Sequence, residues 1–309
     1  MSLLICLPDS FHPQSLSNTL KSLDPELHIE IGPENVKNPS AVEFAVDWAN
    51  TEGHLLNYPN LKAISSYGHG VDYLLSGSKL PEGIPIVRLK DETMANLMSE
   101  YLLAVVLLQR RQFLEYSKNP EFSEWGTSKF HPGNQIGILG LGYLGQASAK
   151  VFLKMGFNVA GWSRRVKHID GISCFSNNEG LTNMLTQTDY LINLLPNTSA
   201  TQDLLNYQTL STLKRGAYVI NVGRGQTLVD EDLIALLHNG HLSGACLDVF
   251  RTEPLPADHQ FRNHNKILIT PHNSSTTQAE SAAKQILENY RRAISGKKLL
   301  HLVDMKHGY

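Results

Sequence analysis

Three side chains able to carry catalysis follow three successive apolar runs in the C-terminal half of the chain. Arg224 lies in residues 221–225 (NVGRG), Glu253 follows residues 247–250 (LDVF), and His272 ends the run ILITPH. A guanidinium can hold a carboxylate, an imidazole can transfer a proton, and a carboxylate can orient that imidazole. Taken alone, Arg224 is equally explained as a surface charge, Glu253 as an acid in a loop, and His272 as a residue at the start of a helix. Because open parallel sheets bind ligands at the carboxyl ends of their strands, the three together predict a catalytic site.

A glycine-rich turn upstream of these residues predicts a dinucleotide site. An apolar run leads directly into Gly140-x-Gly142-x-x-Gly145, and an amphipathic segment follows. Gly140 allows a tight turn, Gly142 lets the backbone approach a pyrophosphate, and Gly145 lets a helix pack closely on the strand. The start of that helix, at Tyr143 and Leu144, presents its N–H groups to phosphate oxygens. An ordinary glycine turn is the alternative, but the flanking strand and helix favour the dinucleotide.

The next predicted strand, residues 158–162, indicates which dinucleotide binds. A site for NAD usually has Asp or Glu about 20 residues further on, against the ribose 2′-hydroxyl. Here the strand is followed by Ser163, Arg164 and Arg165, whose hydroxyl and guanidinium groups suit a 2′-phosphate. Two solvated loop arginines are the alternative. The pattern favours NADP(H) and leaves NAD(H) as the second candidate.

Short apolar runs alternate with longer amphipathic segments along the chain, which is the pattern of a parallel α/β sheet. Gly or Pro breaks separate them. The runs form two series, which predict strands at residues 3–7, 44–48, 62–66 and 84–88, and at 135–139, 158–162, 190–194, 218–221, 244–249 and 267–270. We therefore expect an α/β fold of two doubly wound parallel-sheet domains.

Two helices are expected where the chain passes from one domain to the other. Residues 94–112 are apolar on nearly every face, which requires burial on all sides, so this helix lies in a core, at a subunit interface, or both. Residues 276–295 follow the last strand and return the chain to the first domain. The predicted domains are a discontinuous substrate-binding domain, 1–93 with 276–309, and a nucleotide-binding domain, 94–275.

The composition excludes several other classes of protein. The 309 residues include 27 Lys and Arg against 29 Asp and Glu, a net charge of −2, so neither nucleic acid nor an anionic membrane is expected as a partner. The most apolar stretch, 102–108, is far shorter than the ~20 residues that cross a bilayer. Cysteines and histidines show neither a disulfide framework nor metal-ligand spacing, so we expect a cytoplasmic protein without a metal. The residues concerned are Cys6, Cys174 and Cys246, and histidines such as His259 and His264.

Several motifs, in one order along nearly the whole chain, together resemble the D-isomer-specific 2-hydroxyacid dehydrogenase family. They are GLGYLG at 140–145, LPNT at 195–198, NVGRG at 221–225, LDVF with EPLP at 247–256, and TPH at 270–272. Within the family, the chain is most similar to the glyoxylate/hydroxypyruvate reductase A branch, through Trp48, GHGVD at 68–72 and SRR at 163–165. The resemblance implies a Rossmann-like cofactor domain, a flavodoxin-like substrate domain and a homodimer.

The resemblance also implies roles for individual residues. Arg224 would bind the carboxylate and carbonyl of a 2-oxo acid, and His272 would donate a proton to the developing alkoxide. Glu253 would orient His272 and favour its charged form. The other contacts implied are those of Trp48, His69 and Gly70 with the substrate, and of Leu195, Pro196, Val222, Gly223, Arg224 and Asp248 with the cofactor. Trp48 is equally well explained as a core aromatic at a strand end.

The expected function is NADPH-dependent reduction of a small 2-oxo acid, glyoxylate or hydroxypyruvate, to glycolate or D-glycerate. One alternative is an NAD-linked dehydrogenase of another D-2-hydroxy acid, such as 3-phosphoglycerate or D-lactate. Another is a non-catalytic, dinucleotide-sensing protein similar to corepressors. Two departures from the family pattern bear on the substrate: residues 273–275 (NSS) replace small apolar or glycine residues, and His69 stands where a small or aliphatic residue is usual.

Overall fold

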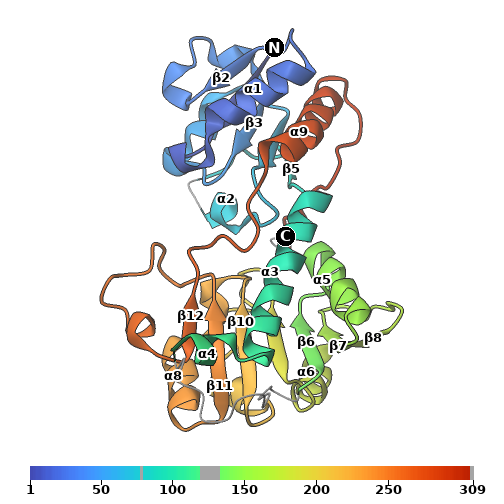
Figure 1. Cartoon of the computed structure of the whole chain (residues 1–309). Coiled ribbons are helices and arrows are strands. Elements are labelled where there is room, and N and C mark those ends of the chain that lie inside the picture. Colours follow the sequence, from blue (N-terminus) through green and yellow to red (C-terminus); the bar gives the residue numbers. More distant parts are fainter. Residues whose placement is uncertain (77–78, 119–132, 307–309) are drawn as a thin grey trace. The chain divides into compact units, whose positions relative to one another are not determined.

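The computed structural model describes residues 1–76, 79–118 and 133–306, and the chain divides into two compact units (Figure 1). The first unit comprises Met1–Met94 with Thr277–Tyr309, and the second comprises Ala95–Thr276. Each unit has its own parallel sheet, covered by helices. The domain boundaries expected from the sequence lie one residue before these.

The first unit contains a five-stranded parallel sheet in the order β2-β1-β3-β4-β5. Its strands are β1 (Ser2–Cys6), β2 (Ile29–Ile31), β3 (Val42–Asp47), β4 (Ala63–Ser66) and β5 (Ile86–Val87). Because side chains alternate along a strand, neighbouring residues of β3 face opposite layers. Phe44 contacts Tyr290 of helix α9 (Ala279–Ile294), which packs beside α1 (Pro13–Leu23). Ala45 instead joins a core with Leu74 of α2 (Asp72–Ser76).

The second unit contains a seven-stranded parallel sheet in the order β12-β11-β10-β9-β6-β7-β8. Its strands are β6 (Gln135–Leu139), β7 (Asn158–Trp162), β8 (Ile172–Phe175), β9 (Tyr190–Asn193), β10 (Ala217–Asn221), β11 (Leu242–Leu247) and β12 (Ile267–Ile269). Its helices are α3 (Glu92–Arg110), which begins in the first unit, α4 (Phe113–Lys118), α5 (Tyr143–Lys154), α6 (Asn177–Leu185), α7 (Tyr207–Ser211) and α8 (Asp230–His238). The strand order reverses between β6 and β9, where open α/β sheets bind ligands.

Both faces of the large sheet are buried. On one face, Ile192 of β9 packs in a core with side chains of α3 and α5. On the other face, its neighbour Leu191 packs with side chains of α6 and α8. Near-continuous apolar strands between two helical layers are what a parallel sheet requires. The predicted α/β class, with two parallel-sheet domains, is confirmed.

Some elements differ from the sequence-based expectation. The short strands β2 and β8 were not predicted; both lie at sheet edges, and most of their residues are only half-buried or exposed, so no apolar run marks them. Helix α3 starts at Glu92 and buries residues such as Leu102 and Val106, while Leu103 and Leu107 are half-buried. Within this chain, α3 is therefore not buried on all sides. No helix among the described residues is long and apolar enough to cross a membrane.

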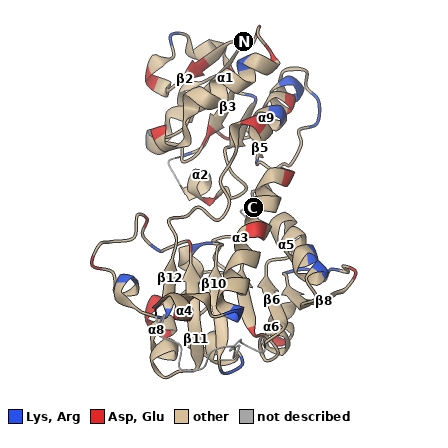
Figure 2. Cartoon of the chain, viewed as in Figure 1, with Lys and Arg blue, Asp and Glu red and all other residues tan. Residues whose placement is uncertain are grey.

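Charged residues of both signs are distributed over the two units (Figure 2). The near balance of acidic and basic residues in the sequence is thus not the sum of two oppositely charged halves.

Candidate active site

The side chains of Glu253 and His272 are in direct contact. Nδ1 of His272 lies 2.7 Å from Oε2 of Glu253. The other carboxylate oxygen, Oε1, accepts the backbone N–H of Phe250 at 2.9 Å, so both oxygens are held. The His272 side chain is 35% exposed and the Glu253 side chain 23%, so the pair borders solvent. Because Nδ1 faces Glu253, Nε2 is the nitrogen able to exchange a proton with a substrate.

Asp248 holds the loop that carries His272. Its carboxylate is fully buried; Oδ1 accepts the Thr270 hydroxyl at 2.5 Å and the Asn273 N–H at 3.0 Å, and Oδ2 accepts the Ser274 N–H at 2.9 Å. His272 itself has a φ of +52°, in the left-handed region that non-glycine residues rarely adopt. The anchors on either side stabilise this backbone conformation. Asp248 therefore fixes the position of the imidazole by holding the loop that carries it.

Tyr101 of α3 extends the same network, and the sequence pattern assigns it no role. Its hydroxyl lies 2.6 Å from Oγ1 of Thr270 and 3.3 Å from Sγ of Cys246. Since the Thr270 hydroxyl donates to Asp248, Tyr101 donates its proton to Thr270. Burial raises the pKa of the Tyr101 hydroxyl, which keeps that proton in place. The sequence signal that could have pointed to this network is Thr270, because it directly precedes the predicted Pro271-His272 pair.

Arg224 follows β10, the strand next to β11 in the sheet. The side chain is half-buried, and its Nη1 donates to the Gly223 carbonyl at 2.7 Å. A β-carbon at Gly225 would lie 1.9 Å from the carbonyl carbon of Phe250. Only glycine fits there, so the arginine loop packs directly on the backbone that leads to Glu253. The structure thus brings these two predicted loops together.

The loops after β9 and β10 also pack against each other. A β-carbon at Gly223 would lie 2.7 Å from the carbonyl oxygen of Leu195. Beneath them, Nδ2 of the buried Asn193 donates to Oδ1 of Asn221 at 2.9 Å and to Oγ1 of Thr227 at 2.7 Å. This buried polar network fixes the ends of both strands. It places four of the predicted cofactor residues on two adjoining loops: Leu195, Pro196, Val222 and Gly223.

The glycine turn has the geometry that a pyrophosphate site requires. Gly140 has a φ of +102°, and a β-carbon at Gly145 would lie 2.0 Å from the Gly140 carbonyl oxygen. A β-carbon at Gly142 would meet no atom within 4 Å among the described residues. Helix α5 begins at Tyr143, and Gly142 provides no side-chain cap. Open space beside an uncapped helix start is suited to a phosphate group, so the turn fits a dinucleotide.

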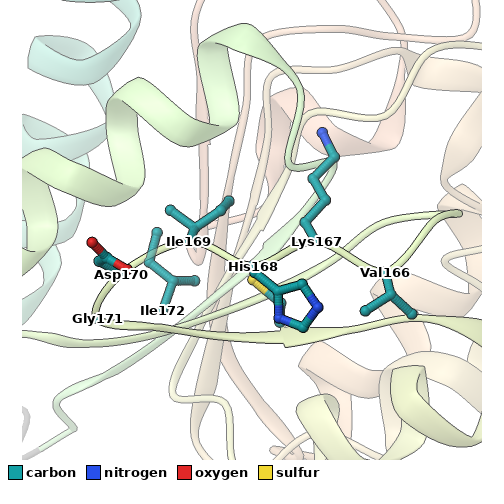
Figure 3. Close-up of a pocket in the computed structure, with 8 residues that line it drawn as sticks. Val166, Lys167, His168, Ile169, Asp170, Gly171 and Ile172 are labelled. Carbon is teal, nitrogen blue, oxygen red and sulfur yellow. The ribbon is translucent and has the colours of Figure 1, made fainter.

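The turn after β7 carries the residues predicted to choose between NADP and NAD. Ser163 is buried and donates its hydroxyl to the Arg165 carbonyl at 2.8 Å, while Arg164 and Arg165 are exposed. Lys167, to which the sequence pattern assigns no role, donates from Nζ to the Leu141 carbonyl in the glycine turn. The basic run Arg-Arg-Val-Lys at residues 164–167 is the sequence signal that could have predicted a role for Lys167. A hollow of about 400 Å³ adjoins this turn (Figure 3), lined by Val166–Ile172 and Cys174.

The substrate residues predicted in the first unit also lie together. The half-buried Trp48 stacks on Tyr73 with ring centroids 5.2 Å apart, and a β-carbon at Gly68 would lie 2.8 Å from its ring. Nδ1 of His69 lies 3.1 Å from the Leu89 carbonyl, so the imidazole is tied to the fold. The Gly70 carbonyl accepts the Ser66 hydroxyl at 3.0 Å. Trp48 and the loop 68–72 therefore form one surface of this unit.

Comparisons with known proteins identify similar chains. The family model "D-isomer specific 2-hydroxyacid dehydrogenase, NAD binding domain" matches residues 103–274, more than half of the chain. Glyoxylate/hydroxypyruvate reductase A of Serratia proteamaculans is 40% identical over 274 residues, which cover 86% of this chain and 88% of that protein.

Two solved structures are similar over their full length. A D-isomer specific 2-hydroxyacid dehydrogenase from Xanthobacter autotrophicus Py2, in complex with NADPH and MES, has a TM-score of 0.92 and 34% identity, covering 100% of this chain and 99% of that one. The NADPH-dependent glyoxylate/hydroxypyruvate reductase of Sinorhizobium meliloti, in complex with NADP and sulfate, has a TM-score of 0.91 and 31% identity, covering 100% of both chains.

Proposed function

The chain belongs to the D-isomer specific 2-hydroxyacid dehydrogenase family, and on that basis we propose that it reduces a small 2-oxo acid to the D-2-hydroxy acid with NADPH. As a member of this family it is an NAD(P)-dependent oxidoreductase. The proposed substrates are glyoxylate and hydroxypyruvate, which the names of its curated relatives contain. The observation that carries the proposal is the contact between Glu253 and His272 beside the arginine loop.

The proposed cofactor is NADP(H), held by the second unit. The glycine turn and the start of α5 would bind the pyrophosphate, and the turn after β7 would bind the 2′-phosphate through Ser163, Arg164, Arg165 and Lys167. The relatives solved with NADPH and NADP support this choice. When bound, the nicotinamide supplies the hydride that adds to the carbonyl carbon of the substrate.

Arg224 and His272 have complementary roles in the proposed reaction. The guanidinium of Arg224 would bind the substrate carboxylate and polarise its carbonyl, a task that suits a planar pair of donors. His272 would donate the proton on Nε2 to the carbonyl oxygen as the hydroxy acid forms. Glu253, in contact with Nδ1, would orient the ring so that Nε2 is the nitrogen that donates. We assign proton donation to His272 and orientation to Glu253.

The remaining assignments are positional. Asp248, supported by Tyr101 through Thr270, fixes the His272 loop, and its predicted contact with the nicotinamide end stays a prediction. In the first unit, Trp48 and the backbone N–H groups of His69 and Gly70 are proposed to contact the substrate. The first unit is accordingly proposed as substrate-binding and the second as nucleotide-binding.

We propose a cytoplasmic homodimer in which α3 is buried by a second copy. The half-buried side chains of Leu97, Leu103 and Leu107 on α3, together with Phe113, whose exposed fraction is 56%, supply apolar surface for that contact. Light scattering of the purified protein tests the stoichiometry. A monomer at micromolar concentration would contradict it.

Initial rates test the proposed reaction. NADPH and NADH are each assayed against glyoxylate, hydroxypyruvate, pyruvate and phenylpyruvate. We expect NADPH with glyoxylate or hydroxypyruvate to give the highest kcat/KM, and His272→Ala to lower kcat by about 10²–10⁴-fold while NADPH still binds. Unchanged turnover in His272→Ala, or tight NADPH binding without oxidation by any keto acid, would refute the proposal.

A further inference from the structure

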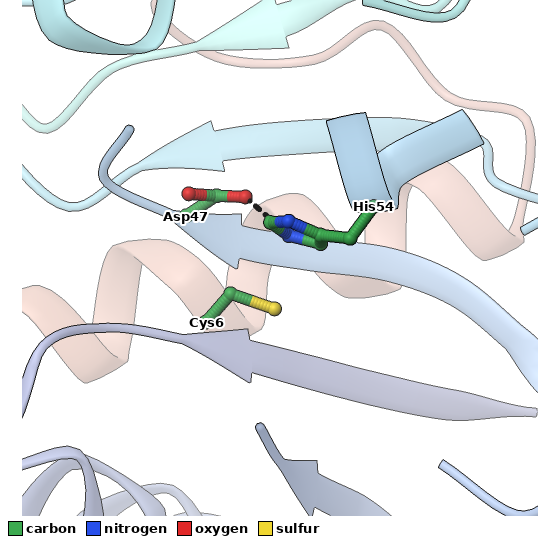
Figure 4. A group of neighbouring side chains, drawn as sticks. All are labelled: Cys6, Asp47 and His54. Carbon is green, nitrogen blue, oxygen red and sulfur yellow. Dashed lines mark ion pairs between the residues drawn. The ribbon is translucent and has the colours of Figure 1, made fainter. Parts of the chain in front are cut away.

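Three metal-ligating side chains meet at the carboxyl end of the small sheet in the first unit (Figure 4). Cys6 is the last residue of β1, Asp47 is the last residue of β3, and His54 lies in the 3-10 helix Thr51–Asn57. The parallel register pairs Cys6 with Asp47, so their side chains leave the sheet on the same face. Sγ of Cys6, a carboxylate oxygen of Asp47 and a ring nitrogen of His54 all lie within 4.8 Å of one another.

Backbone hydrogen bonds orient two of these three groups. Oδ1 of Asp47 accepts the N–H groups of Ala49 and Asn50, each at 2.9 Å, and Oδ2 faces Nε2 of His54 at 2.8 Å. Nδ1 of His54 lies 2.9 Å from the Thr51 carbonyl, so Nδ1 carries a proton and Nε2 is turned to the cluster. Metal-binding histidines have this arrangement, in which one ring nitrogen donates to a carbonyl and the other meets the metal.

Burial makes the cluster costly unless its charges are balanced. The Asp47 side chain is 2% exposed and the His54 side chain 10%. The carboxylate of Asp47 and the ring of His54 are in direct contact, and the Cys6 thiol completes the cluster. A divalent cation would neutralise a thiolate and a carboxylate together.

We propose that Cys6, Asp47 and His54 bind one Zn²⁺-type cation, with water as the fourth ligand. Sulfur, imidazole nitrogen and carboxylate oxygen are the donors that Zn²⁺ takes, whereas Mg²⁺ and Ca²⁺ prefer oxygen alone. Tetrahedral geometry at zinc bond lengths places ligand atoms about 3.3–3.6 Å apart. Nε2 and Oδ2 would thus separate by about 0.5 Å on binding, a shift that rotation of either side chain supplies.

The site is independent of the proposed reaction, because none of its three residues has a role there. The proposal departs from the sequence-based expectation of no metal, which rested on ligand spacing, because Cys6 lies far in the sequence from Asp47 and His54. A bound cation would tie the segment from Asp47 to His54, which includes Trp48, to strand β1.

Titration with Co²⁺, a coloured substitute for Zn²⁺, tests the proposal on the chelator-treated, full-length protein. One equivalent is expected to produce a cobalt–thiolate charge-transfer band, which one equivalent of Zn²⁺ then removes. Cys6→Ser should abolish the band. His54→Gln should weaken Co²⁺ binding by more than the ~10–100-fold that loss of a supporting residue costs. The matched control is Cys174→Ser, a half-buried free cysteine in β8, which should leave the titration unchanged.

Thermal unfolding gives a second measurement of the same site. Zn²⁺ should raise the Tm of the wild type and of Cys174→Ser, but not that of Cys6→Ser. If Cys6→Ser does not fold, Asp47→Asn replaces it, because the amide oxygen still accepts the Ala49 and Asn50 N–H groups. No thiolate band in the wild type, a band that persists in Cys6→Ser, or equal affinity in all variants would overturn the proposal.

Discussion

Oε2 of Glu253 lies 2.7 Å from Nδ1 of His272, although the two residues belong to separate loops. The loops follow β11 and β12, which pair in parallel and therefore end at the same edge of the sheet. The contact decides which imidazole nitrogen is left for chemistry, namely Nε2. Asp248, which directly follows β11, accepts the Thr270 hydroxyl before that ring and the Asn273 and Ser274 N–H groups after it.

Replacing Glu253 by Gln should lower kcat by at least about 10-fold with little change in KM. The amide oxygen can still accept the Phe250 N–H, so the loop is retained, but the negative charge beside Nδ1 of His272 is lost. Steady-state kinetics with NADPH measure this, and the exposed Glu179→Gln is the matched control. Wild-type kcat in Glu253→Gln would show that the contact does not assist proton transfer.

Replacing Asp248 by Asn should lower both stability and turnover. The buried carboxylate accepts three donors, and an amide nitrogen in place of one oxygen would face an N–H or hydroxyl group instead. We expect the free energy of unfolding to fall by about 1–3 kcal/mol, measured by urea denaturation. The exposed Asp170→Asn serves as control. Full stability together with full activity in Asp248→Asn would remove this residue from the positioning role.

Two alanine substitutions in the glycine turn should affect different properties, one the stability of the fold and the other the binding of NADPH. At Gly145 a methyl group would overlap the Gly140 carbonyl oxygen, so Gly145→Ala should destabilise the protein by about 1–3 kcal/mol or more. At Gly142 a methyl group would enter open space, so Gly142→Ala should keep the fold yet weaken NADPH binding by about 10-fold or more. Thermal unfolding and fluorescence titration with NADPH separate the two. Undiminished NADPH affinity in Gly142→Ala would show that no pyrophosphate approaches there.

Removing both arginines of the turn after β7 should change the preference between the two cofactors. We expect kcat/KM for NADPH to fall by about 10–100-fold in Arg164→Ala/Arg165→Ala, because charge-assisted hydrogen bonds to the 2′-phosphate are lost. The value for NADH should stay within about 2-fold, since NADH has no such phosphate. Arg215→Ala, an exposed arginine in the same unit, controls for general loss of charge. An equal fall with both cofactors would contradict the proposed phosphate site.

The fold class and the family could be predicted from the sequence because both depend on local patterns. Apolar runs mark the central strands, and motifs at strand ends reach a common edge once the sheet is parallel. The edge strands β2 and β8 leave no such trace, since they are short and largely half-buried or exposed. The role of Tyr101 could not be predicted for another reason. Its partner Thr270 is 169 positions away, and only packing brings the two together. Packing of the sheet likewise brings Cys6 to Asp47 and His54.

The close packing of Gly225 on Phe250 restricts how this protein can be re-engineered. A library that randomises the arginine loop has to spare position 225, because any larger residue would collide with main-chain atoms. Trp48, by contrast, contacts the rings of Phe11 and Tyr73, which can rearrange, although it also packs closely on Gly68. For the proposed reaction, variants that accept a bulkier keto acid are therefore better sought among the neighbours of Trp48 than in the arginine loop.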